Sequence, residues 1–378
     1  MGQGIINYQI VISLILLFIL INLLVNLRSL KKLKRGEKPY IKPPLVSVLV
    51  PARNESEDIE KCVISLLNQD YPNFEILVLD DNSKDDTIVK LQKIKEKYPH
   101  LKIYSADALP GGWTGKNFAC HILSRYAKGE WLLFTDADTV HKKDSISSSI
   151  DAAIKEKAEL LSIMPDLEME TISEKLYMPL VHFALLSFLP LGLMNDIRNP
   201  KAVIALGPFM FINAEFYRKI GGHKKIKNEI VDDLKLAREV KRNDGRVILM
   251  DGQDKVSLRF YKNFKDLWNG FSKNSFGAFD NSSLILLIFL SINFCLYVLP
   301  YFLFISGILK LELSFFPTLQ VLLITLHRFF LSIRFKTNPW LILLHPVSVL
   351  LGSLIAFNSM LITLFNKPIL WKERVYRP

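Results

Sequence analysis

Acidic residues follow three segments of this chain that have the composition of buried strands. Residues 45–50 run into Pro51 and Glu55, residues 74–79 into Asp80 and Asp81, and residues 131–135 into Asp136 and Asp138. Carboxylates gathered at one edge of a sheet repel one another unless a cation or a donor-rich ligand joins them. Asp136 and Asp138 are spaced one residue apart where a strand ends. They suit a hard ion such as Mg²⁺ or Mn²⁺, which keeps positions open for phosphate oxygens. The pattern predicts a metal–diphosphate site.

Strands and helices must alternate to position these carboxylates. The predicted strands are 45–50, 74–79, 102–105 and 131–135, and the predicted helices between them are 55–68, 84–97 and 116–126. This rhythm is typical of an α/β fold with right-handed crossovers and a mostly parallel sheet, in which ligands bind beyond the carboxyl ends of the strands. Each motif alone has a simpler interpretation, since Asp85 and Asp86 also suit the first turn of a helix.

A glycine-rich segment at 110–117 (PGGWTGKN) resembles a phosphate loop. It is not a Walker A motif, because Pro110 stands where that motif has glycine and Asn117 where it has Ser or Thr. Glycines before a helix still expose N–H groups to an anion. Lys116 is therefore either a contact for a donor phosphate or a surface lysine, and the sequence leaves both open.

The charge of the chain points to a membrane rather than to nucleic acid. The 378 residues are 50% hydrophobic and carry a formal net charge of +11. Most of that charge lies in two short flanks, 28–42 and 367–378, which directly follow apolar stretches. Basic residues just beyond a membrane span face the cytoplasm and its anionic lipid surface. No nucleic-acid partner is expected, and three cysteines form neither a disulfide framework nor a zinc cluster.

Several apolar runs are candidates for membrane spans. Residues 10–27 lack charge and predict an uncleaved anchor whose carboxyl end lies in the cytoplasm. Residues 284–308 and 339–365 are predicted to span as well. Residues 313–333 contain His327 and Arg328, and we expect this piece to lie in the interface or to re-enter it.

Residues 176–194 are also long and apolar enough to cross. We expect them not to do so, because one crossing there would separate Asp138 from Asp233 by the bilayer. Pro179, His182 and Pro190 favour an interfacial or acceptor-lining helix instead.

A family resemblance follows from these same residues. Residues 46–87 (VSVLVPARNESEDIEKCVISLLNQDYPNFEILVLDDNSKDDT), together with FTDAD at 134–138, resemble family 2 glycosyltransferases with the GT-A fold. The resemblance extends over residues 45–275. It implies that Pro51, Glu55, Asp80 and Asp81 line the nucleoside pocket, and that Asp136 and Asp138 bind the metal, with Asp138 the stronger ligand. It also implies that Asp233 is the general base.

A separate argument supports a base at the start of the helix predicted at 232–243. An inverting transfer needs one carboxylate to take the proton of the acceptor hydroxyl, and a diphosphate leaving group needs no protein acid. Asp232 and Asp233 both open this helix, so Asp232 is the alternative base. Simple N-terminal helix charge is the other interpretation of the pair.

The expected protein is a multi-pass plasma-membrane enzyme with a cytoplasmic GT-A domain at 45–280. A membrane anchor at 1–30, a basic and proline-containing linker at 31–44 and a transmembrane region at 281–378 complete the division. Its expected substrates are a nucleotide-sugar donor, for which a UDP-sugar is predicted, and a lipid acceptor. Its layout resembles carotenoid-acid and hopanoid-associated glycosyltransferases. A polysaccharide synthase is the alternative, although the Q-x-x-R-W motif of such enzymes is absent, and a non-catalytic scaffold is another.

Overall fold

The computed structural model describes residues 3–36, 42–194, 199–200, 202–279, 281–312, 314–371 and 374–376. Part of the predicted basic linker (37–41) and part of the basic C-terminal flank (372–373 and 377–378) lie outside the described residues. The chain divides into two compact units. The sheet unit comprises Leu30–Glu168 and Leu193–Phe260, and the helical unit comprises Met1–Ser29, Met169–Gly192 and Tyr261–Pro378. Residues 169–192 and 261–280 therefore cluster with the terminal helices, and a single domain at 45–280 stays a prediction.

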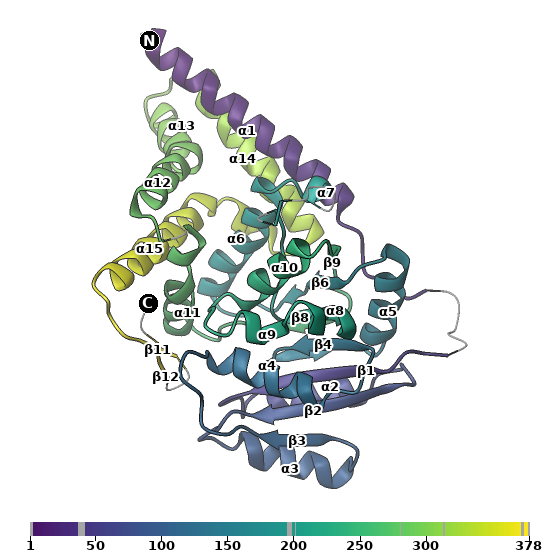
Figure 1. Cartoon of the computed structure of the whole chain (residues 1–378). Coiled ribbons are helices and arrows are strands. Elements are labelled where there is room, and N and C mark those ends of the chain that lie inside the picture. Colours follow the sequence, from purple (N-terminus) through teal and green to yellow (C-terminus); the bar gives the residue numbers. More distant parts are fainter. Residues whose placement is uncertain are drawn as a thin grey trace. The chain divides into compact units, whose positions relative to one another are not determined.

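The sheet unit is built on a seven-stranded sheet of order β3-β2-β1-β4-β8-β6-β9 (Figure 1). Its strands are β1 (Val46–Ala52), β2 (Phe74–Asp80), β3 (Lys102–Ser105), β4 (Trp131–Thr135), β6 (Leu160–Met164), β8 (Phe209–Asn213) and β9 (Val247–Asp251). Strands β3, β2, β1 and β4 are mutually parallel, and β8 runs antiparallel to both β4 and β6. A smaller sheet pairs β5 (Thr139–His141), β10 (Val256–Leu258) and β7 (Asp166–Leu167).

Helices pack on both faces of the large sheet, which explains why its strands are almost continuously apolar. The helices of this unit are α2 (Ile59–Leu67), α3 (Thr87–Lys97), α4 (Gly115–Tyr126), α5 (Ser145–Glu156), α8 (Ala214–Lys219), α9 (Gly222–Lys225) and α10 (Asp232–Arg242). Side chains alternate along each strand, so Val48 and Val50 of β1 share a core with α2, α3 and α5. Leu49 points to the other core, which α4, α8 and α10 cover.

The predicted α/β fold with a mostly parallel sheet is confirmed. All four predicted strands are present within two residues of their expected ends, and α2, α3 and α4 lie where helices were predicted. Strand β8 was not predicted as part of the sheet, and it enters between β4 and β6 with the opposite direction.

The helical unit contains the long apolar segments. Its elements are α1 (Gln3–Ser29), α6 (Ile172–Phe188), α11 (Phe264–Asn274), η1 (Phe276–Phe279), α12 (Ser283–Tyr297), α13 (Leu299–Leu309), α14 (Phe315–Arg334), η2 (Pro339–Ile342), α15 (His345–Leu364), β11 (Ile369–Trp371) and β12 (Arg374–Tyr376), while α7 (Leu191–Met194) crosses the unit boundary. Helix α6 begins with a reciprocal capping box between Thr171 and Glu174.

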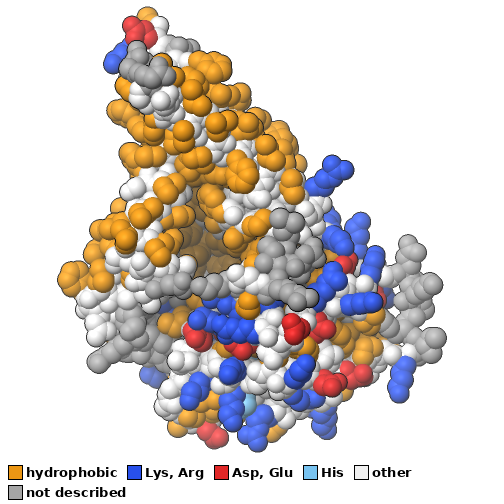
Figure 2. All heavy atoms as spheres, turned by 45° about the horizontal axis from the view of Figure 1, so that its top comes forward, with side chains coloured by type: hydrophobic (Ala, Val, Ile, Leu, Met, Phe, Trp, Pro, Cys, Tyr) orange, Lys and Arg blue, Asp and Glu red, His pale blue; other side chains and the backbone are white. Residues whose placement is uncertain are grey.

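Four stretches of the described chain are long and apolar enough to cross a membrane. They are Gly4–Ser29, Ser283–Leu309, Phe315–Arg334 and His345–Leu364. Large apolar side chains are exposed along these helices, and Figure 2 shows hydrophobic atoms gathered over the helical unit while charged side chains gather over the sheet unit. The third stretch covers the piece predicted to be interfacial, and its length and composition permit a crossing. Helix α6 has 17 residues and is not among the four.

Candidate active site

The end of β4 is held beside the start of β8 by their antiparallel register. Thr135, the last residue of β4, pairs with Phe209, the first residue of β8. The Thr135 hydroxyl donates to the carbonyl of Pro208 over 2.8 Å. The residue after β4 and the residues before β8 therefore meet at one point. These are Asp136 and the segment that contains Gly207.

Three chemically active side chains converge on Gly207. A Cβ atom placed on this glycine would lie 3.2 Å from Lys116 Nζ, 3.4 Å from Asp233 Oδ2 and 3.9 Å from Asp136 Oδ2. Lys116 Nζ contacts Asp136 Oδ1 over 2.7 Å and Asp232 Oδ2 over 3.6 Å. The structure thus brings together the predicted phosphate contact, one predicted metal ligand and both candidate bases.

Asp233 is held by backbone donors rather than by a cation. The Gly207 N–H donates to Asp233 Oδ2 over 2.8 Å, and the Leu234 N–H donates to Oδ1 over 2.7 Å. Burial raises the pKa of Asp233 from 3.8 to about 6, and the Asp232 carboxylate acts in the same direction. Lys116 and the two N–H groups oppose this rise without cancelling it. A carboxyl with such a pKa is close to half-ionised under mildly acidic conditions, as suits a general base.

Lys116 is a charged centre of the site. Burial alone would lower its pKa, but the carboxylates of Asp136 and Asp232 outweigh burial and raise the pKa well above its usual value. A permanent ammonium group between carboxylates offsets their mutual repulsion. Lys116 thus lies beside Asp136 and Asp232, and its role as a contact for the donor phosphate stays a prediction.

A buried asparagine that was not predicted as a site residue positions this cluster. Asn117 is fully buried, and its Nδ2 donates to the carbonyls of Ile226 over 2.7 Å and Glu229 over 2.9 Å. Thr114 caps the same helix through the Asn117 N–H. Asn117 thereby ties the start of α4, which carries Lys116, to the loop that leads into α10. No local motif marks this role, because both partner groups are backbone carbonyls distant in sequence.

Asp138 lies in the tight turn that joins β4 to β5. The Thr139 hydroxyl donates to the Asp136 carbonyl over 2.7 Å, and Thr135, Thr139 and His141 form a buried hydrogen-bonded group beneath the turn. Burial lowers the pKa of His141 to about 3, so this imidazole is neutral. This buried hydrogen-bonded group holds the turn in place. The carboxylates of Asp136 and Asp138 in the turn are half-buried.

The donor set of this turn fits Mg²⁺ or Mn²⁺. Asp136 and Asp138 supply oxygen, which these ions prefer, rather than the sulfur and imidazole typical of zinc sites. Among the described residues, no group of three or more His, Cys, Asp or Glu side chains could hold a metal ion. An ion bound by this turn would therefore complete its coordination with water or with the oxygens of a diphosphate.

The other residues predicted to bind the nucleotide-sugar donor lie at the ends of β1 and β2 and in the loops that follow these strands. Pro51 and Asp80 belong to the ends of these parallel strands, where Ala52 pairs with Asp80. Asp80 and Asp81 are buried, and the Asp81 N–H donates to the Ala52 carbonyl over 2.8 Å. The Glu55 N–H donates to Thr87 Oγ1 over 2.8 Å. All four belong to the carboxyl edge of the sheet.

Two asparagines shape these loops. Asn54 and Asn82 have φ values of 50° and 55°, a left-handed conformation that asparagine adopts more readily than most residues. The Lys84 N–H donates to Asn54 Oδ1 over 2.9 Å, and the Asn54 N–H donates to Ser83 Oγ over 2.9 Å. The two loops therefore brace each other beside Asp80 and Asp81.

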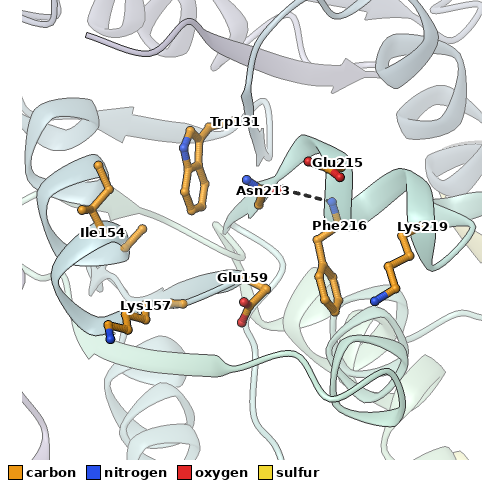
Figure 3. Close-up of a pocket in the computed structure, with 10 residues that line it drawn as sticks. Trp131, Ile154, Lys157, Glu159, Asn213, Glu215, Phe216 and Lys219 are labelled. Atoms are coloured by element: carbon orange, nitrogen blue, oxygen red, sulfur yellow. Dashed lines mark hydrogen bonds between the residues drawn. The ribbon is translucent and has the colours of Figure 1, made fainter. Parts of the chain in front are cut away.

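A pocket of about 400 Å³ also lies on the sheet unit, at the other end of β4 (Figure 3). Trp131, the first residue of β4, lines it together with Lys157, Glu159 and Phe216. None of the predicted site residues lines this pocket. Ligands of open α/β sheets bind at the carboxyl ends of the strands, and this pocket lies at the amino end of β4.

Comparisons with known proteins agree with this geometry. Residues 47–221 match the family model described as glycosyl transferase family 2. A 4,4'-diaponeurosporenoate glycosyltransferase from Staphylococcus haemolyticus is 27% identical over 256 residues, which is 66% of this chain and 64% of the relative. The Staphylococcus aureus enzyme of the same name is 26% identical over 234 residues, or 61% of this chain and 60% of the relative. The chain thus spans less than two thirds of the length of these curated relatives.

A solved structure supports the fold over nearly the whole chain. A mannosyltransferase from Pyrobaculum calidifontis, in complex with GDP-Man and Mn²⁺, aligns with 96% of this chain and 99% of that chain. The TM-score is 0.56 and the sequence identity is 18%, so the likeness concerns the fold alone. The sheet topology, the matched segment and this structural likeness agree: the chain has a GT-A fold, and residues 47–221 are similar to glycosyl transferase family 2.

Proposed function

We propose that this protein is an inverting glycosyltransferase that moves a sugar from a nucleotide-diphosphate donor to a lipid acceptor at a membrane. The observation that carries the proposal is the meeting of Lys116, Asp136 and Asp233 around Gly207. A cation and a metal-binding carboxylate can stabilise the charge of a leaving diphosphate, and a second carboxylate can act as the base. The family 2 match supplies the reaction class.

Donor binding uses the carboxyl edge of the sheet. Pro51, Glu55, Asp80 and Asp81 line the nucleoside pocket, for which we propose a uridine nucleotide. Lys116, at the amino end of α4, contacts the diphosphate together with the exposed N–H groups of that helix end. Asp136 and Asp138 hold Mg²⁺ or Mn²⁺, which neutralises charge on the leaving diphosphate when bound.

Asp233 is the general base in this proposal, and Asp232 is not. The Asp232 carboxylate is already paired with Lys116 Nζ over 3.6 Å. Asp233 Oδ2 is held towards Gly207, and its raised pKa makes it an effective proton acceptor. Asp233 takes the proton of the acceptor hydroxyl as that oxygen attacks the anomeric carbon. The bond to the diphosphate oxygen breaks on the opposite face, and the nucleoside diphosphate leaves with the electron pair.

The acceptor is a lipid, and a carotenoid acid or another isoprenoid is the class we favour. The two Staphylococcus relatives are named for glycosylation of a carotenoid acid, and the helical unit contains four candidate spans. A carboxylic acid acceptor is already ionised at neutral pH, so it needs the base less than a hydroxyl acceptor does. We also propose that the protein resides in the plasma membrane with the sheet unit on the cytoplasmic side, because basic residues follow the first apolar stretch.

A transfer assay tests the proposal. Membranes that carry the protein receive a panel of labelled nucleotide sugars with Mn²⁺ or Mg²⁺, and label in the organic phase is counted. We expect metal-dependent label in lipid that EDTA and Asp138→Ala abolish, while Asp107→Asn, an exposed aspartate after β3, keeps activity. Absence of transfer with every donor, together with no binding of any nucleoside diphosphate, would refute the proposal in favour of a scaffold.

A further inference from the structure

An apolar pocket of about 330 Å³ lies inside the helical unit. Helices α6, α12 and α15 form its walls together with η1 and Ser275, the residue between α11 and η1. The lining includes Leu180 and Phe183 of α6, Phe289 and Leu290 of α12, and Val349 and Ala356 of α15. Its volume falls within the range of about 300–1,000 Å³ that is usual for sites of small organic ligands.

The polar side chains on the pocket wall make their hydrogen bonds within the protein. Ser275 Oγ donates to the Phe271 carbonyl over 2.7 Å, Asn293 Nδ2 to the Phe289 carbonyl over 2.8 Å, and Ser353 Oγ to the Val349 carbonyl over 2.8 Å. The rest of the wall is mainly aromatic and aliphatic. An occupant with many polar groups would lose hydrogen bonds to water here and gain few in return, whereas a hydrocarbon chain would not.

Small residues keep the pocket open. Gly352 has no side chain, and a Cβ there would lie 3.3 Å from Leu180 Cδ1. Ala356 is buried on the same helix, and Ala184 is exposed on α6 at the pocket's edge. Aromatic pairs stand beside this space, with Phe279 and Phe289 at 4.9 Å and Phe183 and Phe188 at 5.6 Å between ring centroids. A slender apolar chain fits such a space between rings and small side chains.

One of the wall helices lies close to the sheet unit along the polypeptide. Helix α6 follows β7 and precedes the segment that contains Gly207. Helices α12 and α15 belong to candidate membrane spans, so in a membrane hydrocarbon would surround them. A hydrocarbon chain held in this pocket would thus contact a helix that leads into the sheet unit.

We propose that this pocket binds the hydrocarbon chain of the lipid acceptor and thereby selects acceptors that carry a long apolar chain. This proposal rests on the proposed function, because it takes the bound lipid to be the acceptor of the sugar. The pocket provides affinity for the chain and leaves the polar head, which receives the sugar, to the catalytic domain. A head group without its chain should therefore be a poor substrate.

Photo-crosslinking of the full-length protein in liposomes tests the pocket directly. The probe is a long-chain fatty acid with a diazirine at mid-chain, and the labelled residues are mapped by mass spectrometry. We expect saturable labelling on α6, α12 and α15 that excess unlabelled fatty acid displaces. Ala184→Phe should reduce it about tenfold or more, since each methylene kept out of the pocket is worth a factor of about four. Ala356→Phe, which fills the pocket from α15, should act in the same way.

Leu354→Phe is the matched control, because Leu354 is exposed on α15 and does not line the pocket. Retained binding of a nucleoside diphosphate shows that each variant is folded. Labelling that does not saturate, or that is equal in Ala184→Phe and wild type, overturns the proposal. Transfer to lipid with labelling elsewhere overturns it as well and leaves the proposed function intact. Saturable pocket labelling without transfer to any lipid refutes the proposed function instead, and the pocket remains a chain-binding site.

Discussion

Replacement of Asp233 by asparagine should inactivate the enzyme and stabilise it at the same time. The pKa of Asp233 rises from 3.8 to about 6 on folding, chiefly through burial. The folded state therefore holds the proton more tightly than the unfolded state does. Asp233 favours folding below pH about 4, and this contribution is lost as the pH rises through 6.

The size of the effect follows from the same pKa. A rise of this extent means that the charged carboxylate costs the folded state about 3 kcal/mol at neutral pH. Asparagine carries no charge and keeps an oxygen for the Gly207 N–H, but it loses the attraction of Lys116. We expect Asp233→Asn to gain about 1–3 kcal/mol at pH 7.5, and each kcal/mol raises Tm by about 2–4 °C. Transfer to a hydroxyl acceptor should fall about 10²–10⁴-fold.

Thermal unfolding in detergent at several pH values tests this reasoning. The Tm difference between Asp233→Asn and wild type should be large at pH 7.5 and should shrink at pH 5, where wild-type Asp233 is protonated. Asp107→Asn makes the same chemical change at an exposed position and should leave Tm unchanged. A variant no more stable than wild type at pH 7.5, or a difference that stays constant with pH, would refute the burial argument. Full activity with a hydroxyl acceptor would refute the base assignment.

Three further predictions concern the same cluster. The rate of transfer to a hydroxyl acceptor should increase with pH through an apparent pKa near 6, because Asp233 must be deprotonated to act. In Lys116→Met, the rise of the residual kcat/KM with pH should shift to higher pH. A rise at the same pH as in wild type would exclude electrostatic coupling of Lys116 and Asp233. Gly207→Ala places a Cβ 3.2 Å from Lys116 Nζ. We expect the displaced ammonium group to lower kcat/KM by up to about 100-fold, with little change in Tm. A wild-type rate would show that the close approach of Lys116 to Gly207 is unimportant. Asn117→Leu leaves one buried and one partly buried carbonyl before α10 without their donor, which should lower the free energy of unfolding by about 1–3 kcal/mol. A denaturant titration measures this, and an unchanged midpoint would contradict the bracing role.

The first half of the sheet was predictable because each element there has a local signature. Strands such as VSVLV and FEILVL are continuous apolar runs, and the helices between them show helical spacing of apolar residues. The carboxylates after the strands were predictable for the same reason, since the ends of parallel strands share one edge. Apolar runs also indicated the candidate spans from composition alone, although the observed helices begin up to six residues away from the predicted starts.

The rest depended on pairings that no local pattern encodes. Strand β8 (FMFIN) has the composition of any buried strand, and nothing in its periodicity gives its direction. Gly207 has no neighbouring motif, and its importance comes from Lys116 and Asp233, which arrive from α4 and α10. The division of the chain was also not predictable, because residues 169–192 lie between two segments of the sheet unit in sequence and join the helical unit through packing.

The antiparallel direction of β8 explains how the cluster can form at all. A parallel neighbour of β4 would bring its own carboxyl end to Asp136 and would place its preceding loop at the opposite edge of the sheet. An antiparallel neighbour brings its start instead, and so the Thr135–Phe209 register sets the segment of Gly207 and Pro208 beside Asp136. The Gly207 N–H then has Asp233 Oδ2 as its acceptor. The Gly207 backbone therefore links Asp233 to the turn that carries Asp136, and its lack of a side chain leaves room for Lys116 Nζ beside them.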